Sequence, residues 1–263
     1  MAAPISNQAQ GPAAPSPGRG IQPWVWVAVG VVVVALVGCL GLSAAAVGWL
    51  SLRGGQDQAQ TDDPPTSLPP VTSKCSYTGS PGRPDASGKQ VGLPPPAPTA
   101  APATRTVTIE TNRGTIGMRL DAERAPCPVH SFLFLAGRSY YDGTACHRLT
   151  TEGLFVLQCG DPTGTGTGGP GYQFAEENLP TSQHPSYPRG TVAMANAGPG
   201  TNGSQFFIVY RDTEIDPNYT IFGQVTQGLD IVEAVAAGGT DNTQGPGDGK
   251  PKLPIVLRSV TVS

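Results

Sequence analysis

The chain has 263 residues, a length that suits one or two domains, and it is rich in glycine (35) and proline (28) while only 13% of its residues are charged. Its net charge is −3 and its 16 lysines and arginines are scattered singly, so no nucleic-acid partner is expected. The three histidines lack metal-ligand spacing, and the glycine-rich run 164–169 is not followed by the Gly-Lys-Ser/Thr of a phosphate loop. We therefore expect neither a metal nor a cofactor.

The amino-terminal part of the chain predicts a membrane anchor. Residues 1–20 form a short tail of Pro, Gly, Ala and Gln that we expect to be disordered, and residues 21–52 contain no charged side chain. The 27 residues from Trp24 to Leu50 would span about 40 Å as a helix, enough to cross a hydrocarbon core of about 30 Å. The alternative is a cleaved signal peptide, whose apolar region is usually only about 7 to 15 residues long.

The position of this anchor predicts a single-pass protein of the cell membrane. Because the tail before the anchor is short, we expect the bulk of the chain to be extracytoplasmic. The positive charges on the two sides, Arg19 and Arg53, give little orientation bias of their own.

Residues 53–103 predict an extended, disordered linker. They are rich in Pro, Thr, Ser and Gly and contain too few apolar side chains to offset the entropy of ordering. The alternative, docking on the folded part of the chain, applies to residues 75–93, which include Tyr77 and Val91.

Residues 104–263 predict a folded domain built from short β-strands. Residues 105–111 and 115–120 alternate polar and apolar side chains around the turn sequence Asn112-Arg113-Gly114, which indicates a hairpin. Two helical patterns are expected at 129–137 and 229–237. Six further strands, which bring the expected number to eight, are predicted at 145–150, 154–159, 191–195, 205–210, 220–225 and 254–262. Many short strands with few helices favour a mainly β barrel or sandwich.

Four stretches of this domain together resemble the signature of the cyclophilin family of peptidyl-prolyl cis/trans isomerases. They are Cys146-His147-Arg148-Leu149, residues 155–163, residues 164–171 and residues 194–207. The resemblance runs from about residue 106 to residue 262, and the anchor and linker are similar to those of membrane-anchored actinobacterial cyclophilins. It implies an eight-stranded antiparallel barrel capped by two helices, with an active-site groove on the outer face of the barrel.

The resemblance also implies a set of site residues. Arg148 matches the catalytic arginine, Gln158 the polar residue that contacts the substrate backbone, and Phe155 and Phe207 the walls of the proline pocket. The remaining positions expected to bind substrate are Val156, Ala195, Asn196, Gln205, Ile215 and Tyr219.

The chemistry of prolyl isomerisation accounts for these residue types. Amide resonance blocks rotation about the X–Pro bond with a barrier of about 18–20 kcal/mol. Relieving it requires a donor aimed at the imide nitrogen, whose lone pair becomes available as the bond twists, and an apolar slot for the ring. Arg148 is always charged and would bind the twisted nitrogen more strongly than the planar one.

The chain departs from the family pattern at two places beside the groove. The separation between His147 and Gln158 is 11, two more than the family spacing, which leaves Leu154 as the alternative to Phe155. Glu214 stands where many members have the tryptophan that binds cyclosporin, and Tyr219 where they have histidine. We therefore expect weak cyclosporin binding with isomerase activity retained.

Four cysteines outside the predicted anchor suit an oxidising compartment. Four cysteines allow three pairings. If the strands that carry Cys146 and Cys159 pair as an antiparallel hairpin, these two come close and leave Cys75 for Cys127; buried free thiols are the alternative.

The sequence therefore predicts an enzyme that rotates X–Pro bonds in exported or surface proteins and assists their folding. Its partners would be proline-containing polypeptides. The alternative is a proline-peptide binding or chaperone module with little turnover. The presence of Arg148, Gln158 and Phe207 together favours the enzyme.

Overall fold

The computed structural model describes residues 75–80, 91–97, 103–181 and 183–263. The predicted tail and anchor, residues 1–20 and 21–52, lie outside these ranges, as does most of the predicted linker. Among the residues that are described, no helix combines the length and the apolar character needed to cross a membrane.

The described part of the chain is mainly β with two helices, as the sequence predicts. The elements in chain order are β1 (Thr78–Gly79), β2 (Thr104–Thr111), β3 (Gly114–Asp121), α1 (Pro126–Ala136), β4 (Thr144–Ala145), β5 (Arg148–Thr150), β6 (Val156–Cys159), β7 (Tyr172–Gln173), β8 (Thr191–Met194), β9 (Phe206–Val209), β10 (Ile221–Gln227), α2 (Leu229–Ala237), β11 (Asp248–Gly249) and β12 (Val256–Val262).

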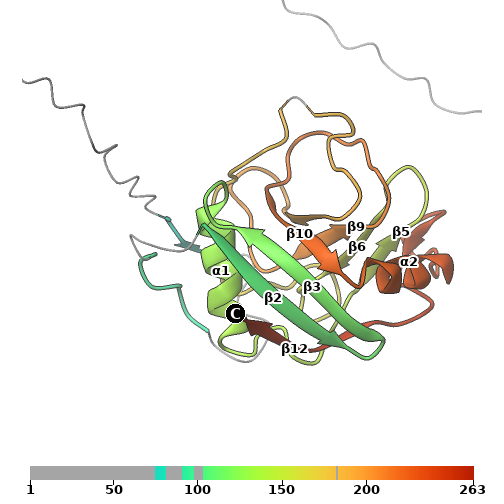
Figure 1. Cartoon of the computed structure of the whole chain (residues 1–263), viewed down its shortest axis with the longest axis horizontal. Coiled ribbons are helices and arrows are strands. Elements are labelled where there is room, and N and C mark those ends of the chain that lie inside the picture. The colour runs from blue at the N-terminus through green and yellow to red at the C-terminus, as the bar shows by residue number, and fades with distance from the viewer. Residues whose placement is uncertain (1–74, 81–90, 98–102, 182) are drawn as a thin grey trace, which may run out of the picture. The chain divides into compact units, whose positions relative to one another are not determined.

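Ten of these strands form one antiparallel sheet, in the order β11-β5-β6-β9-β8-β10-β3-β2-β12-β4. Figure 1 shows β2 and β3 side by side, with α1 and α2 on opposite sides of them. Helix α1 lies against β12 and β3, and α2 lies against β3.

The predicted count of eight strands is wrong because one expected strand changes partner in its middle. Residues 145–150 divide into β4, which pairs with β12, and β5, which pairs with β6. Between them, the Cys146 amide donates to the carbonyl of Ile255 and the His147 amide to that of Gln158. This segment therefore connects the two ends of the sheet. The short strand β11, which the sequence does not predict, extends the sheet beyond β5.

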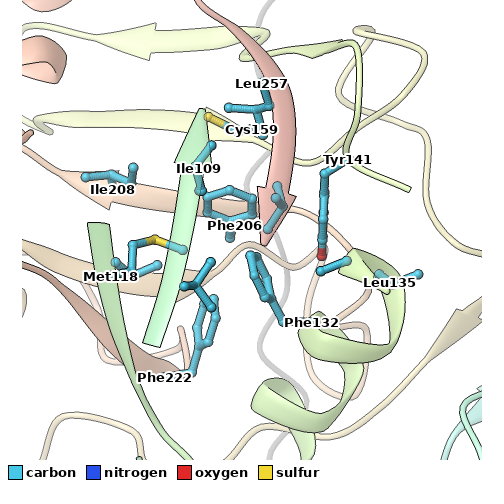
Figure 2. Packing of buried hydrophobic residues seen from close by; sticks show 14 of the residues in the cluster. Ile109, Met118, Phe132, Leu135, Tyr141, Cys159, Phe206, Ile208, Phe222 and Leu257 are labelled. Carbon is cyan, nitrogen blue, oxygen red and sulfur yellow. The ribbon is translucent and has the colours of Figure 1, made fainter. Parts of the chain in front are cut away.

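The core lies between the inner face of the sheet and α1. Alternate residues of β2 and β3 point inward, so that Ile109 and Met118 are fully buried. Phe132 of α1 reaches into this core, stacks on Tyr141 at a centroid distance of 4.8 Å and meets the ring of Phe206 edge-on at 5.5 Å (Figure 2). Such aromatic pairs contribute beyond the area they bury.

Helix α1 begins three residues before the expected start at residue 129, because Pro126 already occupies its first turn. Proline suits that place, since the first amides of a helix have no partner within the helix. The free amide of Cys127 is satisfied from outside by Oε2 of Glu177, at 3.0 Å. Helix α2 has the predicted bounds, 229–237.

Two parts of the predicted linker pack on the domain, so the prediction of a disordered segment does not hold for them. A disulfide joins Cys75 to Cys127 of α1, and β1 pairs with β7. The Tyr77 hydroxyl donates to the carbonyl of Cys127 (3.0 Å) and lies 2.9 Å from Nδ1 of His130. Val91 is buried in the main core. The docking alternative therefore applies to residues 75–80 and to Val91, because these residues carry the apolar and cysteine side chains of the segment.

Candidate active site

Three of the residues predicted for the site lie in one row across three neighbouring strands. Arg148 of β5 is directly opposite Gln158 of β6, and Gln158 is directly opposite Phe207 of β9. Directly paired residues point to the same face of a sheet, so these side chains share a face. It is the outer face, because the residues that alternate with them, such as Leu149 and Leu157, are fully buried in the main core.

Arg148 is held by two neighbours at the polar end of this row. Its Nε donates to Oδ1 of Asp248 at 2.8 Å and its Nη2 donates to Oδ2 at 2.7 Å. Its Nη1 lies 3.5 Å from Oε1 of Gln158. The hydrogen bonds to Asp248 raise the pKa of Arg148 above its ordinary value. The guanidinium is therefore a permanent cation with a fixed plane, and its Nη1 end lies beside Gln158.

A relay of amide side chains fixes the orientation of Gln158. Its Nε2 donates to Oε1 of Gln205 at 2.8 Å, and Nε2 of Gln205 donates to the carbonyls of Gly166 (2.9 Å) and Gly168 (2.8 Å). Since the two carbonyls can only accept, they set which end of the Gln205 amide faces them. The amide of Gln158 must then direct its oxygen toward Arg148.

The glycine-rich loop that supplies these carbonyls is organised around a buried carboxylate. Asp161 accepts hydrogen bonds from the amides of Thr163 (2.8 Å), Gly166 (2.6 Å) and Gly168 (3.1 Å). Burial alone would raise the pKa of Asp161, but these bonds and the Thr163 hydroxyl hold it below its ordinary value. A Cβ at position 168 would collide with the Asp161 carboxylate, which accounts for glycine there. The run 164–169 thus supports Gln205.

A small apolar cluster adjoins Arg148 and Gln158, the two polar residues of this row, which we call the polar row. We call it the pocket cluster; its buried members are Val156, Tyr187, Ala193, Phe207 and Val209, with Leu154, Ala195, Ile215, Tyr219 and Ile221 packed against them. Phe207 meets Tyr219 edge-on, with ring centroids 5.5 Å apart and an interplanar angle of 81°. The pocket cluster is separate from the main core, so the outer side of the sheet has an apolar cluster of its own next to a fixed cation.

Four predicted substrate-binding residues, Val156, Ala195, Ile215 and Tyr219, belong to the pocket cluster together with Phe207. Of the other two, Gln205 is almost fully buried within the amide relay. Asn196 donates from Nδ2 to the carbonyl of Asn218 at 2.9 Å. It therefore ties the segment after β8 to the residue that precedes Tyr219.

Phe155, predicted as a second wall of the pocket, lies elsewhere. It packs against the main core, the guanidinium of Arg211 lies 3.4 Å above its ring, and its edge contacts Tyr210. Side chains alternate between faces along an extended chain, so Phe155 points away from the face that Val156 occupies. Leu154 is two residues before Val156, so its side chain points to the same face, and it packs against the pocket cluster, as the alternative assignment expects.

Tyr187 is a member of this site that the sequence does not reveal. It is fully buried, and its hydroxyl accepts from the amide of Tyr219 (2.9 Å) and donates to the carbonyl of Tyr219 (3.1 Å). Both backbone groups of Tyr219 are therefore held by one side chain. A tyrosine between two prolines carries no sequence signal for such a role.

Glu214 carries a negative charge beside the pocket cluster, next to Ile215. It accepts hydrogen bonds from the amide (3.0 Å) and the hydroxyl (3.1 Å) of Ser186, and Nδ1 of His184 lies 3.6 Å away. The bond from the Ser186 amide lowers the pKa of Glu214 below its ordinary value. The carboxylate is therefore ionised at neutral pH.

A second disulfide fastens the two strands that carry the polar row. It joins Cys146, two residues before Arg148, to Cys159, which follows Gln158 directly. Together with Cys75–Cys127 it gives the same two pairs that the hairpin argument expects. Within the described ranges, no group of three or more His, Cys, Asp or Glu side chains is arranged to hold a metal ion.

We expect the domain to lose stability as the pH falls from 7.5 to 5.5. Burial lowers the pKa of both His130 and His147 below the ordinary value of 6.5. Near pH 6.5 the unfolded chain therefore binds more protons than the folded chain does. As the pH drops below 6.5, the free energy of unfolding decreases. Burial raises the pKa of Glu177, so its protonation has the opposite effect on stability, but at lower pH, closer to its ordinary pKa of 4.5.

Urea denaturation at pH 7.5, 6.5 and 5.5 measures the free energy of unfolding, and His147→Gln should make that free energy depend less steeply on pH. Equal stability at pH 7.5 and 5.5 would contradict it.

Comparison with known proteins gives one consistent family. The family model described as "Cyclophilin type peptidyl-prolyl cis-trans isomerase/CLD" matches residues 106–262. "Probable peptidyl-prolyl cis-trans isomerase B" of Mycobacterium tuberculosis is 47% identical over 199 residues, which cover 71% of this chain and 63% of that protein. The chain thus matches less than two thirds of the length of that relative.

A shorter relative and a solved structure match almost over their full length. "Peptidyl-prolyl cis-trans isomerase A" of Mycobacterium tuberculosis is 43% identical over 180 residues, covering 61% of this chain and 93% of the relative. The crystal structure of a cyclophilin type peptidyl-prolyl cis-trans isomerase from Cryptosporidium parvum is 32% identical. It superimposes with a TM-score of 0.53 and covers 61% of this chain and 98% of its own.

Proposed function

The chain belongs to the cyclophilin-type peptidyl-prolyl cis-trans isomerases, and from that premise we propose that it rotates X–Pro bonds in exported or surface proteins and assists their folding. The observation that carries the proposal is the row of Arg148, Gln158 and Phe207 on the outer face of the sheet. This row joins a fixed hydrogen-bond donor to an apolar surface, which are the two groups that the reaction requires.

The proposed mechanism follows from the directions in which these groups point. The pocket cluster binds the proline ring, while Gln158 and Asn196 bind the peptide backbone on either side. As the X–Pro bond twists, its nitrogen becomes pyramidal and its lone pair becomes an acceptor. Arg148 uses Nε and one Nη2 hydrogen on Asp248, and its Nη1, which lies 3.5 Å from Oε1 of Gln158, directs one hydrogen toward that oxygen. The second Nη1 hydrogen remains for this nitrogen. The interaction is stronger in the twisted state than in the planar one, so it lowers the barrier.

Turnover by the purified full-length chain tests this proposal. A protease-coupled assay with a Xaa-Pro peptide should show a rate well above the uncatalysed one, which takes tens to hundreds of seconds at 25 °C. Peptide binding, measured separately by NMR titration, separates the enzyme from a proline-binding module. Peptide binding without a faster rate of X–Pro isomerisation would favour the proline-binding module and contradict the proposed enzymatic function.

We propose further that the chain is a single-pass membrane protein with its catalytic domain outside the cytoplasm. The apolar residues 21–52 and the two disulfides support this location, since disulfides persist in oxidising compartments. Protease added to intact cells should remove the catalytic domain while a cytoplasmic marker survives. Protection of the domain until the cells are lysed would overturn the proposed orientation.

Weak inhibition by cyclosporin is expected, because a hydrogen-bonded carboxylate, Glu214, stands where many family members have a tryptophan. Glu214→Trp should lower the inhibitory concentration at least tenfold while leaving uninhibited turnover within about twofold. An inhibition curve for both proteins measures this. Strong inhibition of the unmodified chain would contradict the expectation.

A further inference from the structure

Asp248 is the partner of Arg148, the residue proposed to carry the chemistry, although it belongs to none of the four stretches that carry the family resemblance. Its carboxylate binds Arg148 through two parallel hydrogen bonds of 2.8 and 2.7 Å. The pair is only partly buried, with 30% of the Arg148 side chain and 25% of the Asp248 side chain exposed. This two-point, partly buried pair contributes to folding as well as to the geometry of Arg148, and the thermal melts described below separate the two effects.

The two-point contact fixes the plane of the guanidinium. A single hydrogen bond lets an arginine side chain rotate about the bond axis, whereas two parallel bonds from Nε and Nη2 do not. The edge of the fork that faces Asp248 is fully used, so Nη1 is left toward Gln158. Asp248 thus decides which end of Arg148 lies beside Gln158.

The loop that presents Asp248 is itself constrained. Strand β11 pairs with β5 so that Asp248 lies opposite Thr150, two residues from Arg148 and on the same face. The residues on either side of Asp248 are glycines, and neither position has room for a side chain. A Cβ at position 247 would lie 2.7 Å from Cγ of Glu152, and one at position 249 would lie 2.8 Å from the amide nitrogen of Thr243. Asp241 fastens the loop from within by accepting from the amides of Thr243 (3.1 Å) and Lys250 (2.8 Å).

We propose that Asp248 is a positioning residue for Arg148, which holds the guanidinium in the plane from which Nη1 can reach the twisted imide nitrogen. This inference rests on the proposed isomerase function and extends it to a residue outside the row of Arg148, Gln158 and Phe207 and outside the pocket cluster. It acts on the donor, so it should change turnover more than it changes peptide binding.

Asp248→Asn tests the proposal because it keeps the size of the side chain and removes one of its two acceptors. The amide NH₂ then opposes an N–H of Arg148, and the fork is no longer held at two points. We expect kcat/KM to fall about tenfold while the Kd for the peptide, from NMR titration, stays within twofold. The Nε–H resonance of Arg148 should show slow solvent exchange in the unmodified protein and fast exchange in the variant.

Two further variants make the result specific. Asp121→Asn provides a control at another arginine–aspartate pair: Asp121, the last residue of β3, is 26% exposed and accepts from Nε of Arg124 at 2.7 Å, with Arg124 71% exposed. This variant should keep kcat/KM within twofold. Asp248→Glu restores two acceptors and should recover part of the lost turnover. If Asp248→Asn is destabilised in thermal melts, Asp248→Glu supplies the decisive comparison.

The outcomes separate this inference from the function on which it rests. Absence of turnover in the unmodified chain would refute the isomerase function. Turnover in the unmodified chain and equal turnover in Asp248→Asn would refute only the positioning role. A proportional loss of peptide binding and turnover, or an equal loss in Asp121→Asn, would likewise refute it.

Discussion

Replacing Arg148 with alanine should lower kcat/KM by a factor on the order of 10² to 10³, the loss typical when one preorganised donor to a transition state is removed. The reason is that no other cation or donor among the described residues has a position in the polar row equivalent to that of Arg148 Nη1. Gln158 is oriented with its oxygen toward Arg148 by the amide relay, so it cannot substitute as a donor at that point. Exchange NMR or the protease-coupled assay measures the change.

The folded state should tolerate this substitution, which makes the kinetic result interpretable. The Arg148 side chain is 30% exposed, so water can reach Asp248 after the substitution; loss of the two charge-assisted hydrogen bonds should lower the melting temperature by several degrees without unfolding the domain. Arg148→Lys provides the matched control. It keeps the charge but lacks the planar fork, so its turnover should stay close to that of the alanine variant. Near-normal turnover in Arg148→Lys would show that charge alone is sufficient and would contradict the proposed geometry.

Replacing Cys75 and Cys127 together with alanine should lower the free energy of unfolding by about 4 kcal/mol, the value that chain entropy gives for a closed loop of this size. The bridge closes 52 residues, whereas Cys146–Cys159 closes 13, for which the same relation gives about 3 kcal/mol. Urea denaturation of the two double variants measures the difference. Equal stability of the unmodified chain and the Cys75/Cys127 variant would contradict the expectation.

The two double variants should differ most clearly in activity. Cys75–Cys127 fastens a segment to α1, so its loss should leave turnover at 25 °C unchanged. Cys146–Cys159 fastens the strands that carry Arg148 and Gln158, so its loss should reduce turnover as well as stability. Mass spectrometry of a peptic digest without reduction establishes the pairs independently. Four free thiols would overturn both disulfide predictions.

The sequence predicts most of the architecture because local patterns determine it. Alternation of polar and apolar residues indicates the hairpin of β2 and β3, and the 3.6-residue period indicates α2 to the residue. The strand expected at 145–150 is divided because its backbone exchanges one partner strand for another at Cys146 and His147. The alternation of buried side chains is broken at that point, since Cys146 and Leu149 both lie in the main core although they are three positions apart; a single strand predicted over 145–150 misses this break.

The candidate site is predictable only where residues lie in family motifs. The structure places three of the motif residues in one row: Arg148, Gln158 and Phe207. The choice between Leu154 and Phe155 follows the two-residue insertion between His147 and Gln158, and it depends on which face of the sheet each side chain occupies. Asp248 and Tyr187 act through contacts that join positions 100 and 32 residues apart. Such contacts arise from tertiary structure, and a single sequence contains no signal for them.

The Cys75–Cys127 bridge also sets the path that mechanical force takes through the domain. Tension on the chain upstream of Cys75 passes across the sulfur atoms directly into α1, and the segment between the two cysteines, including β2 and β3, carries none of it. A hairpin pulled from its end would open one hydrogen bond at a time, but here that end bears no load. In Figure 1, α1 lies on the other side of the domain from β5 and β6. A load applied through the upstream chain therefore enters the domain at α1 and not at the strands that hold Arg148 and Gln158.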